Sequence, residues 1–212
     1  MNVKTKKINK KNPWLQRQDK DPFVKMAKEM GYKSRAAFKL LEIDKKYKLL
    51  RNISSVCDIG AAPGGWSQVI SKTFQNLQGK SKTPPQIIAI DLLDMDPIPF
   101  VQFIKGDFTK PETLEMLNNI EFDLIVSDMA PNTSGHQETD HLKSMTLSYS
   151  VIEFVKQKLK PSCNFAIKIF LGSKEKQFVD EVKKIFQKVE YFKPESSRSE
   201  SKEIYIIGLN KK

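Results

Sequence analysis

Residues 55–66 read SVCDIGAAPGGW, in which a short apolar run leads into an acid, a glycine-rich turn and the start of a helical pattern. The glycines would let the backbone approach a ligand closely, and the first turn of the following helix offers free N–H groups to an anion. The stretch has neither the Gly-Lys-Ser/Thr of a P-loop nor the Gly-x-Gly-x-x-Gly spacing of a dinucleotide site. Asp58, directly before the turn, would repel a phosphate but suits a ligand with an ammonium group. A plain turn between a strand and a helix would look similar. Other parts of the chain are therefore needed to distinguish a ligand site from a plain turn.

Helix-like and strand-like patterns alternate outward from this turn. We expect helices at residues 22–47 (with a break near Gly31), 66–74, 111–119, 139–159 and 174–187. We expect strands at residues 53–59, 86–91, 101–105, 122–127, 164–170, 190–193 and 203–209. The alternation predicts an α/β fold, with a mostly parallel sheet covered by helices on both faces. No helix separates the last two strands, so we expect that pair to be antiparallel.

The length and composition fit one domain. The chain has 212 residues, and 39% of them are hydrophobic, which is enough to build a core. No apolar run approaches the ~20 residues of a membrane span, and the basic start of the chain is unlike a secretion signal. We therefore expect a single domain over residues 21–212, in the cytoplasm or in an organelle such as a mitochondrion.

The positive charge is concentrated at one end. Of the net charge of +11, all lies in residues 1–51, which carry 16 basic and 5 acidic side chains, whereas the remainder is balanced. We expect residues 1–20 to form a flexible basic arm and residues 21–50 a helical part that faces a polyanion. Aromatic residues among these charges (Trp14, Phe23, Tyr32) favour a nucleic acid, because bases stack on aromatic rings. A solubilising lysine tail is the alternative.

The sequence offers no cluster of metal ligands. Its two cysteines, Cys57 and Cys163, lie far apart beside apolar runs and are expected to be buried thiols. The two histidines, His136 and His141, fall in a polar stretch. We therefore expect no metal site.

Acids follow three successive strands of the predicted sheet. In an open α/β sheet, ligands bind beyond the carboxyl ends of the strands. Asp58 ends the first strand, Asp91 the second, and Asp107-Phe108 follows the third. An acid after the second strand commonly binds the ribose hydroxyls of an adenosine ligand, and Asp107-Phe108 suits the amino group and face of an adenine. Together with an ammonium-binding acid, the pattern indicates S-adenosylmethionine.

A lysine and an aspartate follow in the next two strands. Asp128 ends the fourth strand, and Lys168 lies inside the apolar fifth strand. A lysine buried on both faces of a sheet is costly. One interpretation is an edge lysine that reaches solvent; the other is a proton acceptor whose pKa is lowered by burial and by a cation such as Lys39, against the opposing effect of Asp128.

The sequence resembles the FtsJ/RrmJ-type RNA 2′-O-methyltransferases along almost the whole chain, from Trp14 to Leu209. The matching stretches are SRAAFKL at 34–40, DIGAAPGGW at 58–66, DLL at 91–93 with MDP at 95–97, GDF at 106–108, SDMAPN at 127–132 with SG at 134–135, KP at 193–194 with SSR at 196–198, and EIYI at 203–206.

The resemblance implies the class I methyltransferase fold, with seven strands of which the last is antiparallel. It also implies a monomer with a catalytic tetrad at Lys39, Asp128, Lys168 and Glu203, and no metal. The residues that it implies for binding S-adenosylmethionine are Asp58, Gly60, Ala61, Pro63, Gly64, Gly65, Trp66, Asp91, Leu92, Asp107, Phe108 and Asp128.

Only resemblance to particular subfamilies indicates which RNA is the substrate. The GGW at 64–66 and the DMAPN at 128–132 are similar to the ribosomal members, where tRNA-modifying members tend to read GSW and DGAPD. This implies methylation of a uridine ribose in large-subunit rRNA, recognised in an assembled or assembling particle. The alternatives are a tRNA 2′-O-methyltransferase and a non-catalytic RNA-binding assembly factor. An NAD-type dehydrogenase is disfavoured, because the glycine spacing is wrong for it.

Overall fold

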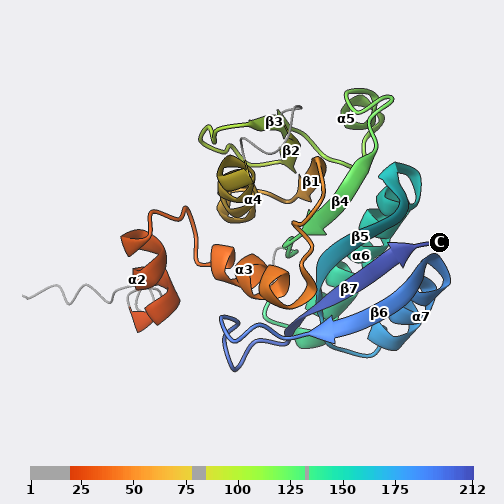
Figure 1. The fold of residues 1–212 in the computed structure, drawn as a ribbon. Helices are drawn as coiled ribbons and strands as arrows, with labels where there is room; N and C mark the ends of the chain where they lie inside the picture. The colour runs from red at the N-terminus through yellow and green to blue at the C-terminus, as the bar shows by residue number, and fades with distance from the viewer. Residues whose placement is uncertain (1–19, 78–84, 132–133) are drawn as a thin grey trace, which may run out of the picture.

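The computed structural model describes residues 20–77, 85–131 and 134–212, and it has seven strands in one sheet (Figure 1). The predicted arm, apart from Lys20, lies outside the described residues. The strand order is β3-β2-β1-β4-β5-β7-β6, and β7 alone runs antiparallel to both of its neighbours. This confirms the predicted fold class. The strands are β1 (Ser55–Ile59), β2 (Gln86–Asp91), β3 (Val101–Lys105), β4 (Phe122–Ser127), β5 (Leu159–Phe170), β6 (Phe186–Phe192) and β7 (Glu203–Lys211).

Helices cover both faces of the sheet and enclose two apolar cores. On one face α3 and α4 pack through residues such as Leu40 and Ile70, and on the other α6 and α7 pack through residues such as Ile152 and Phe178. Helix α2 lies outside these layers, beside α3 (Figure 1). The helices are α2 (Pro22–Glu29), α3 (Ala36–Tyr47), α4 (Gly65–Leu77), α5 (Pro111–Glu115), α6 (Gln137–Lys158) and α7 (Glu175–Ile185).

The connections place a ligand site in the middle of the sheet. From β1 the chain moves outward through β2 to β3, and then returns to β4, which pairs with the other side of β1. Strand order therefore reverses between β1 and β4. The crevice beyond the carboxyl ends of strands at such a reversal is the usual ligand site of this architecture.

Most predicted elements agree with the structure, and one of the differences has a clear tertiary cause. The predicted helix at 174–187 ends at Ile185, because Phe186 belongs to β6, where its ring stacks on Phe165 at 4.7 Å between centroids. The predicted helix at 111–119 ends at Glu115. Cys57 is buried as predicted, but Cys163 is partly exposed. His141, which falls in a polar stretch of the sequence, is nevertheless buried.

Candidate active site

Two adjoining cavities lie at the point where the strand order reverses. The larger has a volume of about 670 Å³ and the smaller about 180 Å³. Gly60, Ala62 and Asp128 line both of them, so these residues form a common wall. Gly60 has a φ of +75°, and a Cβ there would lie 1.9 Å from the Met129 Cγ. Only glycine therefore lets the turn after β1 pack against the loop after β4.

The larger cavity contains the acids predicted for an adenosine. Both carboxylate oxygens of Asp91 accept backbone N–H groups, from Ala62 and Leu93 at 2.8 Å each. Asp107 also lines the cavity, and hydrogen bonds from Thr109, the backbone N–H foremost, lower the pKa of this carboxyl. Asp107 is thus held in place as a charged acceptor, and Asp91 is held in place by its two backbone donors.

Apolar side chains complete this cavity in two different ways. Leu92 lines it with 65% of its surface exposed. Phe108 also lines it, but the ring is largely buried and packs edge-on against Phe154. Phe108 is therefore mainly a core residue that presents a small part of its surface to the cavity.

The smaller cavity contains a buried carboxylate with one unpartnered oxygen. Asp58 is 1% exposed; its Oδ2 accepts from the Ser67 hydroxyl at 2.6 Å, and its Oδ1 has no partner in the part of the chain that the structure describes. Burial raises the pKa of Asp58 to about 7, against the lowering effect of the Ser67 hydrogen bond. An oxygen of this kind fits an ammonium group of a ligand, because a buried charge needs a partner.

The structure brings the predicted cofactor residues to these two cavities, with Gly64 as the exception. Gly64, at a φ of +103°, packs against Ile98 and Met95 instead. Trp66 lines the smaller cavity, but its indole N–H donates to the Ala36 carbonyl at 2.8 Å, so the side chain mainly packs α4 on α3. No cluster of three or more potential metal ligands occurs among the described residues.

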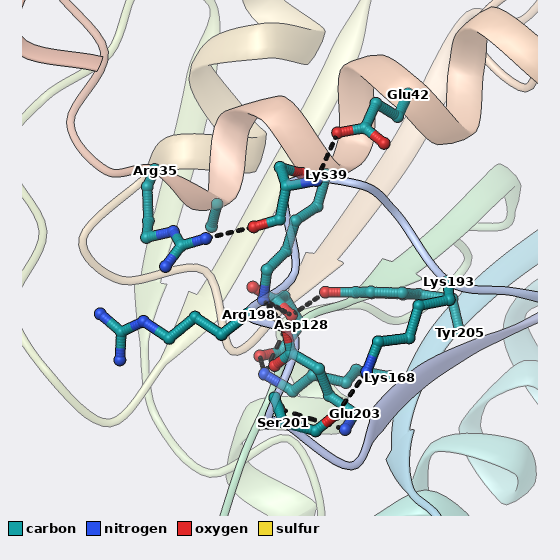
Figure 2. Close-up of polar contacts among 12 residues, drawn as sticks. Arg35, Lys39, Glu42, Asp128, Lys168, Lys193, Arg198, Ser201, Glu203 and Tyr205 are labelled. Carbon is teal, nitrogen blue, oxygen red and sulfur yellow. Dashed lines mark hydrogen bonds and ion pairs between the residues drawn. The ribbon is translucent and has the colours of Figure 1, made fainter. Parts of the chain in front are cut away.

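Four charged residues from four elements meet at the common wall (Figure 2). The Lys168 Nζ lies 2.9 Å from the Asp128 Oδ1 and also donates to the Asp128 carbonyl at 2.6 Å. The Lys39 Nζ lies 2.8 Å from the Glu203 Oε1 and 3.8 Å from the Asp128 Oδ1. We call these four residues the charge network. Lys168 is 8% exposed and Lys39 7%, so the interpretation of Lys168 as a lysine that reaches solvent is wrong.

The sequence reasoning missed Tyr205, which also binds Asp128. The Tyr205 hydroxyl donates to the Asp128 Oδ1 at 2.5 Å, and the ring stacks on Trp66 at 5.7 Å between centroids. The Lys39 Nζ lies 5.8 Å from the centre of the same ring. The spacing in the sequence did indicate Tyr205. It is two residues after Glu203 on one strand, so both side chains point to the same face of the sheet.

The surroundings favour the ionised form of both carboxyl groups in the charge network. Burial favours the protonated form of Asp128, but the positive charges of Lys168 and Lys39 outweigh it and lower the pKa. Burial likewise favours protonated Glu203, and Lys39 lowers the pKa of that carboxyl. Burial raises the pKa of Tyr205, and Asp128 raises it further. At neutral pH the site thus holds two carboxylates and a protonated tyrosine.

A second set of polar contacts ties the chain before Glu203 to α2 and α3. Asp21 accepts from both Arg35 and Arg198, and Arg35 also donates to the Ser196 carbonyl. The Glu42 carboxylate accepts the N–H of Ser196 at 2.9 Å (Figure 2). These bonds fix the β6–β7 connection, and therefore the start of the strand that carries Glu203.

The sheet order and the paired cavities define an α/β protein of the methyltransferase type. The family model for FtsJ-like methyltransferases matches residues 32–211, and the chain belongs to that family. It is 46% identical, over 99% of its length and 92% of the relative, to a protein of Rickettsia typhi named ribosomal RNA large subunit methyltransferase E. A protein of Rickettsia bellii with the same name is 45% identical over 94% of this chain and 88% of the relative.

A solved structure shows the same fold. It is described as a putative ribosomal RNA methyltransferase from Plasmodium falciparum, with a TM-score of 0.74 and 35% sequence identity. The similarity covers 85% of this chain and 98% of that structure.

Proposed function

We propose that this protein transfers a methyl group from S-adenosylmethionine to a ribose 2′-hydroxyl of large-subunit rRNA. The observation that carries the chemistry is the pairing of Lys168 with Asp128 at the wall shared by the two cavities. The names of the relatives support rRNA as the substrate. We also propose that the protein acts as a monomer, in the cytoplasm or an organelle, with residues 21–212 as its catalytic domain.

The cavities suggest how the methyl donor would bind. Asp58, with its unpartnered oxygen in the smaller cavity, would hold the ammonium group of the methionine part. Asp91 would bind the ribose hydroxyls, and Asp107 the adenine amino group, both in the larger cavity. Asp128 borders both cavities and so lies where the two parts of the ligand would join.

Lys168 is the proposed acceptor of the hydroxyl proton. Bound S-adenosylmethionine would supply an electrophilic methyl group, so that the protein must orient the ribose and remove the proton. A neutral amine has two N–H groups and one lone pair. The two contacts of the Lys168 Nζ with Asp128 use both N–H groups, which leaves the lone pair for the hydroxyl proton. The protonated Lys168 then stays paired with the Asp128 carboxylate.

Lys39 and Glu203 would position the target ribose. They form an ion pair of their own next to Asp128. Lys39 also places a second cationic side chain near the Asp128 carboxylate. This chemistry uses no metal ion, and a chelator should leave the rate of transfer on folded RNA unchanged.

The experiment compares purified large ribosomal subunits, naked rRNA and tRNA in competition for labelled methyl groups, with the modified nucleotide mapped. We expect a 2′-O-methylated uridine in the large-subunit rRNA. Preferential labelling of tRNA would favour the tRNA alternative and leave the chemistry standing. Binding of rRNA and cofactor without transfer to any RNA would favour the non-catalytic assembly factor.

A further inference from the structure

The end of β5 projects beyond its parallel neighbour. Strand β4 ends at Ser127, which pairs with Ile167, so residues 168–170 extend past it. Their other side pairs with β7, where Phe170 faces Glu203. Lys168 therefore lies on a strand segment that β4 does not cover. The backbone N–H and C=O groups that face away from β7 at this edge have no strand to pair with. They need other hydrogen-bond partners if the segment is to be held in one conformation.

Two buried side chains of α6 hold this edge. The Ser144 hydroxyl oxygen accepts the Phe170 N–H at 3.2 Å, and the His141 Nδ1 lies 2.8 Å from the Phe170 carbonyl oxygen. Helix α6 thus does at Phe170 what a neighbouring strand would do, since it satisfies both backbone groups of one residue. Phe170 is two residues from Lys168 and pairs with Glu203, so the contact fixes a segment next to two members of the charge network.

The same contacts determine the protonation of His141. A carbonyl oxygen can only accept, so the Nδ1 carries a hydrogen. The Lys174 N–H donates to the Nε2 at 2.9 Å, so the Nε2 carries none. The ring is 2% exposed, and it packs so closely on Gly172 that a Cβ there would lie 2.5 Å from the His141 Cγ. His141 is therefore held as a neutral imidazole between the end of β5 and the start of α7.

We propose that His141 is a positioning residue for Lys168, acting through the backbone of Phe170. The neighbouring Asp140 accepts the N–H groups of Ser134 and Gly135, at 2.6 and 3.1 Å, and so ties the chain just before α6 to the first turn of the helix that carries His141. The inference rests on the proposed methyl transfer and adds a residue to it that touches neither ligand.

The test compares three substitutions in the full chain. His141→Leu removes both hydrogen bonds, Ser144→Ala removes one, and His141→Asn keeps a donor where the Nδ1 lies. We expect H141L to lower kcat for methylation of large subunits about tenfold or more, because small displacements of a reacting group are that costly. S144A should lower kcat in the same direction, and H141N should recover most of the loss. The KM for S-adenosylmethionine should not change in any of them.

A matched control and a second readout separate positioning from folding. Ser150→Ala removes a hydroxyl whose bond runs to the Thr146 carbonyl within α6, and it should keep the wild-type kcat. Long-range ¹H–¹⁵N NMR reads the protonation of each imidazole nitrogen. Because the protein has two histidines, the variant His136→Gln identifies the signals of His141. We expect a protonated Nδ1 and a bare Nε2 at neutral pH.

The outcomes are distinguishable. An unchanged kcat in both H141L and S144A, or a protonated Nε2, would overturn the inference. If H141L does not fold, the kcat of S144A decides. An active wild type with unaffected variants refutes only the positioning role, whereas a wild type that transfers no methyl group to any RNA refutes the proposed function and the inference with it.

Discussion

At the scale of single residues, Asp128 organises the site. Its carboxylate oxygen Oδ1 accepts from Lys168 and Tyr205 and lies within ion-pair distance of Lys39. Each of these partners comes from a different element, so a correct fold is needed to assemble them. The arrangement keeps Asp128 charged in spite of its burial, and a charged Asp128 in turn fixes the direction of the Lys168 amine.

Replacing Lys168 by Ala should abolish methyl transfer, because general-base catalysis is typically worth ~10²-fold or more. Cofactor affinity should stay nearly unchanged, since Lys168 is not among the residues that line the two cavities. Single-turnover transfer and calorimetry measure the two effects. The matched control is Lys160→Ala, which removes a lysine paired with Asp123 at the other end of β5 and should keep the rate. Retention of more than about a tenth of the wild-type rate in K168A would refute a role as base.

Asp58 should make cofactor binding depend on pH. Because its pKa is about 7, the carboxylate form that suits an ammonium group becomes dominant only above that pH. Affinity for S-adenosylmethionine should therefore rise as pH increases through 7, and Asp58→Asn should remove this rise. Calorimetric titrations below and above pH 7 measure it. Equal affinities on both sides of pH 7 in the wild type would contradict the assigned role.

The same group affects the stability of the ligand-free protein. Between the ordinary pKa of 3.8 and the folded value of about 7, the folded protein binds more protons at Asp58 than the unfolded chain does. This contribution to stability is therefore greatest at low pH and is lost as pH rises through that window. The loss should be smaller in D58N, measured as the change in melting temperature with pH.

At the scale of elements, the sequence predicted three strands to the residue, and the errors arose where tertiary contacts decide. β2, β3 and β4 have the predicted bounds. The end of α7 could not be read from periodicity, because Phe186 suits a helix as well as the sheet, where it stacks on Phe165. Among the members of the charge network, Asp128, Lys168 and Lys39 were predicted from the residues as well as from family resemblance, and Glu203 from the resemblance alone. Tyr205 and His141 were missed, since their partners lie far away in the sequence.

Asp123 should stabilise the end of the sheet opposite the site, where the central strands begin. Its carboxylate accepts the Ser54 N–H at 2.7 Å and the Ser55 N–H at 3.0 Å, and it pairs with Lys160 at 2.7 Å, so it joins the starts of β1, β4 and β5. Burial favours the protonated acid, but these bonds outweigh it and hold the pKa at about 2.

Replacing Asp123 by Ala should lower the free energy of unfolding by on the order of 2 kcal/mol at neutral pH, because charge-assisted hydrogen bonds are removed. In the wild type this contribution is complete above pH 3.8 and is lost as pH falls toward 2. Urea unfolding at pH 7 and at pH 3 measures both. An equal destabilisation at the two pH values would show that the bonds do not depend on the charge.

At the scale of the whole molecule, the net positive charge is confined to one part of the chain. Residues 1–51 carry the entire net charge, while the charges of the rest cancel. Within the described residues of this segment, α3 carries Lys39 of the charge network, and α2 lies beside α3 (Figure 1). A chain with one basic end can bind phosphates strongly without reading a base sequence, which favours recognition of a folded RNA surface.

Removing residues 1–20 should weaken RNA binding and make the remaining binding less sensitive to salt. For every phosphate that the shortened protein no longer neutralises, the slope of log K against log salt should become shallower by about 0.7 to 0.9. Binding isotherms at several salt concentrations measure this, and cofactor affinity serves as the control that the domain is intact. An unchanged slope would show that this segment does not bind the RNA.

The place of β7 in the sheet has a consequence for biosynthesis. β7 comes last among the strands, yet it lies between β5 and β6 and carries Glu203 and Tyr205. While it is still inside the exit tunnel of a translating ribosome, β5 and β6 have no common neighbour, and Asp128 lacks its tyrosine partner. A nascent chain is therefore unable to complete the charge network until β7 has left the tunnel, and a premature stop anywhere upstream of Glu203 would leave an open sheet edge for chaperones and proteases to recognise.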